Sequence, residues 1–320
     1  MIVAGPTASG KSALALALAR NLGGAIINAD SMQTYRELRV LTARPTPDDE
    51  AAAPHVLYGV RPAAEPGSVA WWRTAALAAM DEAHAQGRVP ILCGGSGMYF
   101  EALVHGLAEI PDPGAAARAE ARGLLAEIGP PALHARLAVA DPATAARLLP
   151  SDSQRLARAW EVWRGTGRGL AAWQADPALP AAPWDFFAVQ LDPPRDELRA
   201  AIETRFDAML DAGAIEEVRR LLALGLDPAL PAMRAHGVPE LATFLAGDRS
   251  LDAARLRACQ VTAQYTKRQA TWFRHHNLAP QACTEIFLAR IDAKAQVSER
   301  IMAGITNFLS SRVDAPQHGT

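Results

Sequence analysis

The chain has 320 residues, of which 50% are hydrophobic and 21% are charged, and its formal net charge at pH 7 is −2. This length and composition predict one large α/β domain, or a core domain with a smaller second one, and they exclude global disorder. The charge excludes a protein coated in positive charge, but it is compatible with a local basic surface.

The cysteines and the lengths of the apolar runs indicate in which cellular compartment the protein is expected. Cys93, Cys259 and Cys283 are far apart and have no metal-ligand spacing, so we interpret them as reduced, mostly buried thiols. No apolar run approaches the roughly 20 residues that cross a bilayer. These features predict a cytoplasmic protein without a membrane partner.

Strand and helix patterns alternate in the first part of the chain. Glycine turns separate the predicted elements, which are a strand over Met1–Ala4, a helix over Ala13–Leu22, a strand over Ala25–Asp30, a helix over Val69–Gln86 and a strand over Val89–Cys93. Strands and helices that alternate across short turns form a parallel sheet covered on both faces.

The pattern changes from about Pro111. Residues 113–176 are rich in alanine, leucine and arginine, and prolines divide them into several helices. A strand signal returns at Asp185–Leu191, and amphipathic helices follow over Arg195–Leu224. We therefore predict an α/β fold in which a parallel sheet covered by helices carries an inserted all-helical subdomain. The predicted core is 1–112 with 177–313, the insertion is 113–176, and the tail 314–320 is flexible.

A phosphate-binding loop follows the first strand. The pattern G-x-x-x-x-G-K-[ST] is matched at every fixed position by Gly5, Pro6, Thr7, Ala8, Ser9, Gly10, Lys11 and Ser12. Such a loop points backbone N–H groups at phosphate oxygens, the lysine adds charge, and the serine hydroxyl can ligate Mg²⁺. The loop predicts a di- or triphosphate site, but it serves a kinase and a transferase equally well.

Asp30 ends the second predicted strand, at the sheet edge where parallel α/β folds bind ligands. Taken alone, its carboxylate could ligate magnesium, act as a general base or simply cap the following turn. The residues around it distinguish between these roles only through a wider resemblance.

That resemblance is to the tRNA dimethylallyltransferases, and it covers roughly residues 1–280. It is carried by ordered blocks: Asp30-Ser31-Met32-Gln33-Thr34-Tyr35-Arg36, Thr42-Ala43-Arg44-Pro45, Gly94-Gly95-Ser96 with Tyr99, Pro150-Ser151-Asp152-Ser153-Gln154-Arg155-Leu156-Ala157-Arg158-Ala159, and Lys267-Arg268-Gln269 with Thr271-Trp272-Phe273-Arg274. Leu41 stands where the family usually has glycine. Together with the phosphate loop, these blocks resemble the bacterial type of the family, with a P-loop NTPase-like core.

The resemblance implies a reaction and its partners. Dimethylallyl diphosphate would be the donor, and the acceptor would be the N6 amine of the adenine 3′ of the anticodon (position 37) in the anticodon stem-loop of tRNA. Asp30 would take the amine proton, while Lys11, the loop amides, Mg²⁺ on Ser12 and Arg234 would stabilise the leaving diphosphate. Thr7 would hydrogen-bond either the bridging oxygen or the amine. No protein partner is implied.

The resemblance also implies an RNA-binding surface. The residues expected to contact tRNA are Asp30, Ser31, Met32, Gln33, Ser96, Arg118, Gln154, Arg155, Leu156, Ala157 and Arg158. The adenine would leave its stack to reach Asp30, and Gln33 could read its edge.

Other functions remain open from the residues themselves. A P-loop kinase of small molecules or nucleosides would use the same loop without RNA. A nucleotide-dependent RNA-binding switch would leave Asp30 idle. Transfer of the prenyl group to a free adenosine nucleotide would leave the arginine-bearing insertion unexplained.

Overall fold

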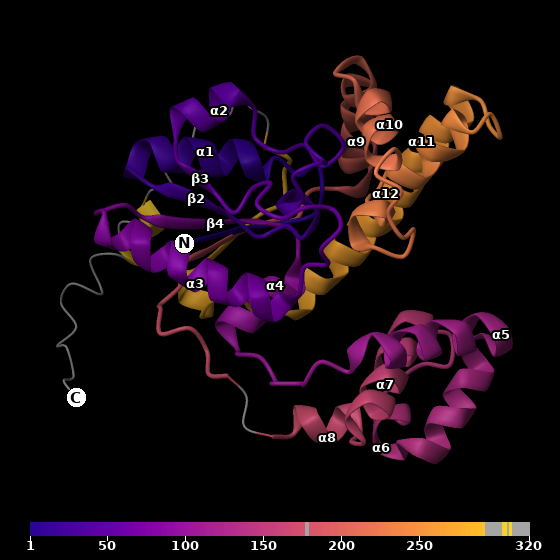
Figure 1. The fold of residues 1–320 in the computed structure, drawn as a ribbon. Helices are drawn as coiled ribbons and strands as arrows, with labels where there is room; N and C mark the ends of the chain where they lie inside the picture. Colours follow the sequence, from indigo (N-terminus) through magenta and orange to yellow (C-terminus); the bar gives the residue numbers. More distant parts are fainter. Residues whose placement is uncertain (177–178, 292–302, 306, 309–320) are drawn as a thin grey trace. The chain divides into compact units, whose positions relative to one another are not determined.

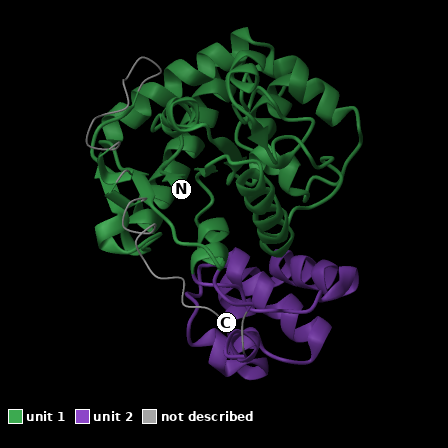
Figure 2. Ribbon diagram, turned by 90° about the vertical axis from the view of Figure 1, so that its left-hand side faces the viewer, with its two compact units in different colours: residues 1–104, 182–320 green, residues 105–181 purple. Residues whose placement is uncertain are grey.

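The computed structural model describes all residues except 177–178, 292–302, 306 and 309–320, so the predicted tail 314–320 lies outside the described residues. The chain forms two compact units (Figure 2). Unit 1 comprises residues 1–104 and 182–320, and unit 2 comprises residues 105–181. Each unit has its own apolar core.

Unit 1 is built on a parallel sheet. Its strands are β1 (Ile2–Ala4), β2 (Ala25–Asn28), β3 (His55–Val56), β4 (Pro90–Gly94), β5 (Ala188–Leu191) and β6 (Thr284–Phe287), in the order β3-β2-β4-β1-β5-β6. Every pairing is parallel. The predicted parallel α/β fold is confirmed, and β1 lies inside the sheet, so the loop that follows it starts from a fixed strand.

Helices cover both faces of this sheet (Figure 1). On one face lie α1 (Lys11–Leu22) and α2 (Pro47–Ala52), and on the other lie α3 (Val69–Ala85) and α4 (Gly97–Val104). Leu14 and Leu18 of α1 are buried with strand residues, as are Trp72 and Phe100 on the opposite face. Burial of one large apolar side chain stabilises the fold by about 1.5–3 kcal/mol, so these layers hold the strand ends in place.

A second helical layer of unit 1 lies beside the carboxyl ends of the strands. It consists of α9 (Arg195–Asp211), α10 (Ala214–Leu222), α11 (Val238–Leu245) and α12 (Leu251–His275). Unit 1 also contains the short turns η1 (Met32–Thr34), η2 (Pro231–Arg234) and η3 (Gln281–Cys283). Its core joins Phe206, Val218 and Leu241 to Tyr35 and Leu38 of the segment after β2. This layer brings residues from the second half of the chain to the phosphate loop.

Unit 2 contains α5 (Gly114–Ala140), α6 (Pro142–Ala145), α7 (Ser153–Thr166) and α8 (Leu170–Gln174). The long α5 is interrupted at Gly129, where φ is 74° and ψ is 170°. The two prolines that follow can begin a new helical segment but cannot continue the old one. Leu133, Leu137 and Leu156 form the centre of the apolar core.

No helix in the described part of the chain is both long enough and apolar enough to cross a bilayer.

Candidate active site

The phosphate loop joins β1 to α1, and it is held by a hydrogen bond within the loop and by a close contact with Ile291. The buried Lys11 donates from Nζ to the carbonyl of Pro6 at 3.2 Å. Gly10 has a φ of 93°, and a Cβ there would lie 1.7 Å from the carbonyl oxygen of Ile291. Only glycine combines that backbone with so close a neighbour. Burial lowers the pKa of Lys11, an effect that the nearby Asp30 opposes.

Asp30 lies just after β2 and uses only half of its carboxylate structurally. Its Oδ1 accepts the backbone N–H of Met32, the first residue of η1, at 3.0 Å. Asn28 holds the backbone of Asp30, accepting its N–H at 2.8 Å and donating to its carbonyl at 3.0 Å. No residue of the described chain donates to Oδ2. That oxygen is therefore available to accept a proton from a ligand.

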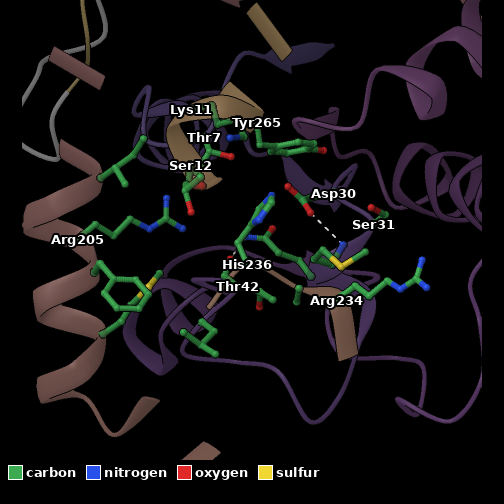
Figure 3. A pocket seen from close by; sticks show the side chains of 18 of the residues that line it. Thr7, Lys11, Ser12, Asp30, Ser31, Thr42, Arg205, Arg234, His236 and Tyr265 are labelled. Atoms are coloured by element: carbon green, nitrogen blue, oxygen red, sulfur yellow. Dashed lines mark hydrogen bonds between the residues drawn. The ribbon is translucent and has the colours of Figure 1, made fainter. Parts of the chain in front are cut away.

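Both elements open into one cavity of about 270 Å³ (Figure 3). The cavity combines a phosphate-binding end with a wall contributed by the segment after β2 and a wall of helical residues. Its lining is Thr7, Lys11, Ser12, Asp30, Ser31, Met32, Gln33, Leu41, Thr42, Ile202, Arg205, Phe206, Met209, Arg234, Ala235, His236, Thr262, Tyr265 and Arg268. A carboxylate and a phosphate loop thus face the same space.

Two arginines line this cavity in different ways. Arg205 of α9 was not among the predicted site residues; it is partly buried, and its guanidinium points toward Ser12 (Figure 3). Arg205 also lines an adjoining cavity with Lys11 and Ser12. The predicted Arg234 is exposed, and its guanidinium points away from Lys11 and Ser12. The sequence signal for Arg205 is a charged residue next to Ile202 and Phe206, both on the buried face of an amphipathic helix.

The charge of Arg205 is held in a partly desolvated position. Burial lowers its pKa, Asp30 opposes that shift, and Arg290 adds to it. An arginine nevertheless stays protonated in proteins. The arrangement places a permanent positive charge near the phosphate loop, with no ion-pair partner among the described residues.

Two aromatic side chains, His236 and Tyr265, also line the cavity. The rings of His236 and Tyr265 have centroids 4.9 Å apart, and Arg268 lies 5.6 Å from the Tyr265 ring centroid. Burial raises the pKa of Tyr265 to about 12, and burial lowers the pKa of His236. Both side chains are therefore neutral near pH 7, and neither was predicted from the sequence.

The structure brings Ser31, Gln33 and Ser96 of the predicted adenine pocket together, but Gln33 has fewer free hydrogen-bonding groups than expected. Ser31 donates its backbone N–H to Oγ of Ser96 at 2.9 Å. The amide nitrogen of Gln33 donates to the carbonyls of Thr42 and Ala43 at 2.8 and 3.0 Å. Its donor group thus holds the Thr42-Ala43-Arg44-Pro45 block, and only its oxygen is left for a base edge.

The remaining predicted tRNA contacts belong to unit 2. Gln154 and Arg155 are exposed on α7, Ala157 and Arg158 are partly buried, and Leu156 is fully buried in the core, so its side chain does not reach the surface. Short ion pairs hold the arginines: Arg155 with Asp152, Arg158 with Glu161, and Arg118 of α5 with Asp112.

Metal binding can be tested against the side chains present. Within the described residues, no cluster of three or more His, Cys, Asp or Glu side chains could hold a metal ion. Burial raises the pKa of the neighbouring Cys93 to about 11, so it remains a thiol at neutral pH. The exposed Ser12 hydroxyl and the Asp30 carboxylate supply hard oxygen atoms, which fit Mg²⁺ held chiefly by substrate phosphates and water.

A family model and the most similar relatives found point to the same protein family. Residues 33–276 match the IPP transferase family. The chain is 63% identical over 309 residues to the tRNA dimethylallyltransferase of Granulibacter bethesdensis, covering 97% of both chains. It is 62% identical to the enzyme of the same name from Gluconobacter oxydans, covering 98% of this chain and 95% of that one.

Solved structures agree with this. The tRNA isopentenylpyrophosphate transferase of Bacillus halodurans is 31% identical, covers 98% of this chain and 95% of its own, and superposes with a TM-score of 0.65. A eukaryotic dimethylallyltransferase acting on tRNA is 23% identical, covers 97% of this chain and 79% of its own, and shares the fold with a TM-score of 0.77.

Proposed function

The chain belongs to the IPP transferase family of tRNA dimethylallyltransferases, and on this premise we propose how its cavity joins the dimethylallyl group of dimethylallyl diphosphate to N6 of the adenine 3′ of the anticodon. The observation that carries the proposal is the free Oδ2 of Asp30 in the same cavity as the phosphate loop. A proton acceptor for the amine thus shares one space with a binding site for the leaving group.

The reaction forms one bond and breaks one. The N6 lone pair, weakened by delocalisation into the ring, attacks the allylic carbon, whose bond to the bridging oxygen breaks and leaves its electron pair on the diphosphate. The amine proton passes to Asp30, which acts as general base. Only a carboxylate with an unpaired oxygen can do this without first losing another hydrogen bond.

The departing diphosphate gains negative charge, and the phosphate loop is built to stabilise it. Lys11 and the backbone amides would hold the terminal phosphate. Arg205 fits the role assigned to Arg234 from the sequence, because its guanidinium points toward Ser12 while that of Arg234 points away (Figure 3). Arg234 is better placed to contact RNA phosphate at the exposed end of the cavity.

Mg²⁺ would be held by Ser12 together with diphosphate oxygens and water. Bound there, it supplies charge neutralisation for the leaving group.

The acceptor base would enter from a tRNA loop. Adenine would have to leave its stack, and Ser31 and Met32, which follow Asp30 in the cavity lining, would contact it. The arginines of unit 2 would bind the phosphates of the anticodon stem-loop, since exposed guanidinium groups suit phosphate and unpaired bases.

The test is transfer of label. Purified protein with Mg²⁺, radiolabelled dimethylallyl diphosphate and unmodified tRNA should place label in RNA, and Asp30→Ala should lose about 100-fold or more of the rate, as removal of a general base does. Asp30→Asn is the closer variant, because its side-chain oxygen can still accept the N–H of Met32. Full transfer by Asp30→Asn would overturn the role of Asp30.

A further inference from the structure

A buried glutamine on α12 connects the phosphate loop to the turn after β4. Gln269 is 5% exposed. Its Oε1 accepts the backbone N–H of Thr7 at 2.9 Å and the Thr7 hydroxyl at 3.1 Å, and its Nε2 donates to the carbonyl of Gly95 at 2.9 Å. The buried amide is therefore hydrogen-bonded at both ends.

The partners fix which way this amide points. A carbonyl oxygen can only accept, so Nε2 must face Gly95, and a backbone N–H can only donate, so Oε1 must face Thr7. Because Oε1 is an acceptor, the single proton of the Thr7 hydroxyl is directed to Gln269. The hydroxyl thus presents lone pairs, not its proton, to the cavity that Thr7 lines.

The fit at Gly95 supports a specific contact. A Cβ at this position would lie 2.3 Å from Nε2 of Gln269, so only glycine allows the amide to come this close. The same turn continues into Ser96, whose Oγ accepts the backbone N–H of Ser31, the residue after Asp30. One amide therefore ties Thr7 to the turn that holds the segment bearing the general base.

We propose that Gln269 is a positioning residue that orients the Thr7 hydroxyl as a hydrogen-bond acceptor for the attacking N6 amine. The inference rests on the proposed function of this cavity and selects the amine over the bridging oxygen as the partner of Thr7. The amine has two hydrogens: one is directed to Thr7, and the other passes to Asp30. The lone pair is thereby aimed at the allylic carbon.

The test uses Gln269→Met, which keeps an unbranched side chain of similar length but has no amide. It should lower kcat about 10- to 100-fold, the value of one or two hydrogen bonds in the transition state. KM for dimethylallyl diphosphate should change less than about threefold, because Gln269 hydrogen-bonds the phosphate loop at Thr7 and not at Lys11 or Ser12. Thr7→Val should lower kcat similarly. The double variant should be no slower than the slower single variant, because both changes remove one interaction.

Gln264 lies on the same helix and is exposed, so Gln264→Met is the matched control and should keep wild-type kcat. Gly95→Ala is a second variant if Gln269→Met does not fold, since the added methyl displaces the amide without removing it. It should show the same fall in kcat.

An unchanged kcat in Gln269→Met or Gly95→Ala would overturn the inference, because the amide would then play no part in the reaction. A raised kcat would also overturn it, because a freed Thr7 proton would then serve the bridging oxygen. Losses that multiply in the double variant would also overturn it. Failure of the wild-type protein to label RNA would instead contradict the proposed function.

Discussion

At the residue scale, the cavity separates two kinds of positive charge. Lys11 is buried and Arg205 is partly buried beside the phosphate loop, whereas Arg234 is exposed. Electrostatic interactions are stronger where water is excluded. An arginine therefore contributes more to a leaving diphosphate at the first position than at the second, although both line the same cavity.

Replacement of each arginine by glutamine separates these roles. Arg205→Gln should lower kcat/KM for dimethylallyl diphosphate about 100- to 1000-fold, as loss of a preorganised charge-stabilising group does. Arg234→Gln should lower it less than about tenfold and act chiefly on KM for tRNA. Steady-state kinetics with each substrate varied in turn measures both effects. An Arg234→Gln enzyme that is the slower of the two at saturating tRNA would restore the assignment made from the sequence.

The side chains of the site differ in how far the sequence reveals them. Thr7, Lys11 and Ser12 belong to one contiguous loop whose backbone path depends only on local residues, so a motif is enough to predict their grouping. Arg205 and Gln269 come from helices α9 and α12, which are far from the loop in the sequence. Their place depends on how apolar faces pack, and a local pattern does not encode that.

At the element scale, a buried carboxylate shapes the loop that lines the cavity beside Asp30. Glu217 of α10 is 4% exposed, and it accepts the backbone N–H groups of Arg39, Val40 and Leu41 at 2.7, 2.7 and 2.9 Å. Leu41 and Thr42 then face the cavity. A charged acceptor fits three converging donors in a place where unpaired N–H groups would be costly.

Glu217→Gln tests this support. The amide nitrogen must face at least one backbone N–H, so the free energy of unfolding should fall by about 1–3 kcal/mol, and KM for both substrates should rise. Denaturant unfolding and steady-state kinetics measure the two effects. The neighbouring Glu216 is exposed and pairs with Arg219, so Glu216→Gln should change stability by less than about 1 kcal/mol. Equal stability of the two variants would contradict the role of Glu217.

The elements themselves were predictable where their patterns were strong. The strands around the phosphate loop and the helix over Val69–Ala85 agree with their predicted ranges to within a few residues. The two-residue β3 carries no periodicity to detect. The edge strand β6 is only partly buried, so it lacks the continuous apolar run that marks a central strand.

At the scale of the whole molecule, the residues proposed for the chemical step and those proposed to bind RNA phosphates lie in two units with separate apolar cores. The phosphate loop, Asp30 and Gln269 all lie in unit 1, while α7 with its exposed Gln154 and Arg155 lies in unit 2. A unit with its own core can bear surface substitutions without disturbing the other unit's cavity. Surface substitutions in unit 2 should therefore change the binding of RNA and leave the rate of the chemical step unchanged.

Removal of charge from α7 tests that separation. Within the described residues, Arg155 pairs with Asp152 and Arg158 with Glu161, and ion pairs of such partly exposed groups are weak enough to yield to RNA phosphates. In Arg155→Gln/Arg158→Gln, the salt dependence of tRNA affinity, as the slope of log K against log salt, should fall by about 1.4–1.8 for two lost phosphate contacts, while kcat at saturating tRNA stays at the wild-type value. The exposed Arg220 of α10 provides the control, since Arg220→Gln should leave the slope unchanged. Equal slopes for the double variant and the control would show that α7 is not the phosphate-binding surface, whatever happens to the rate.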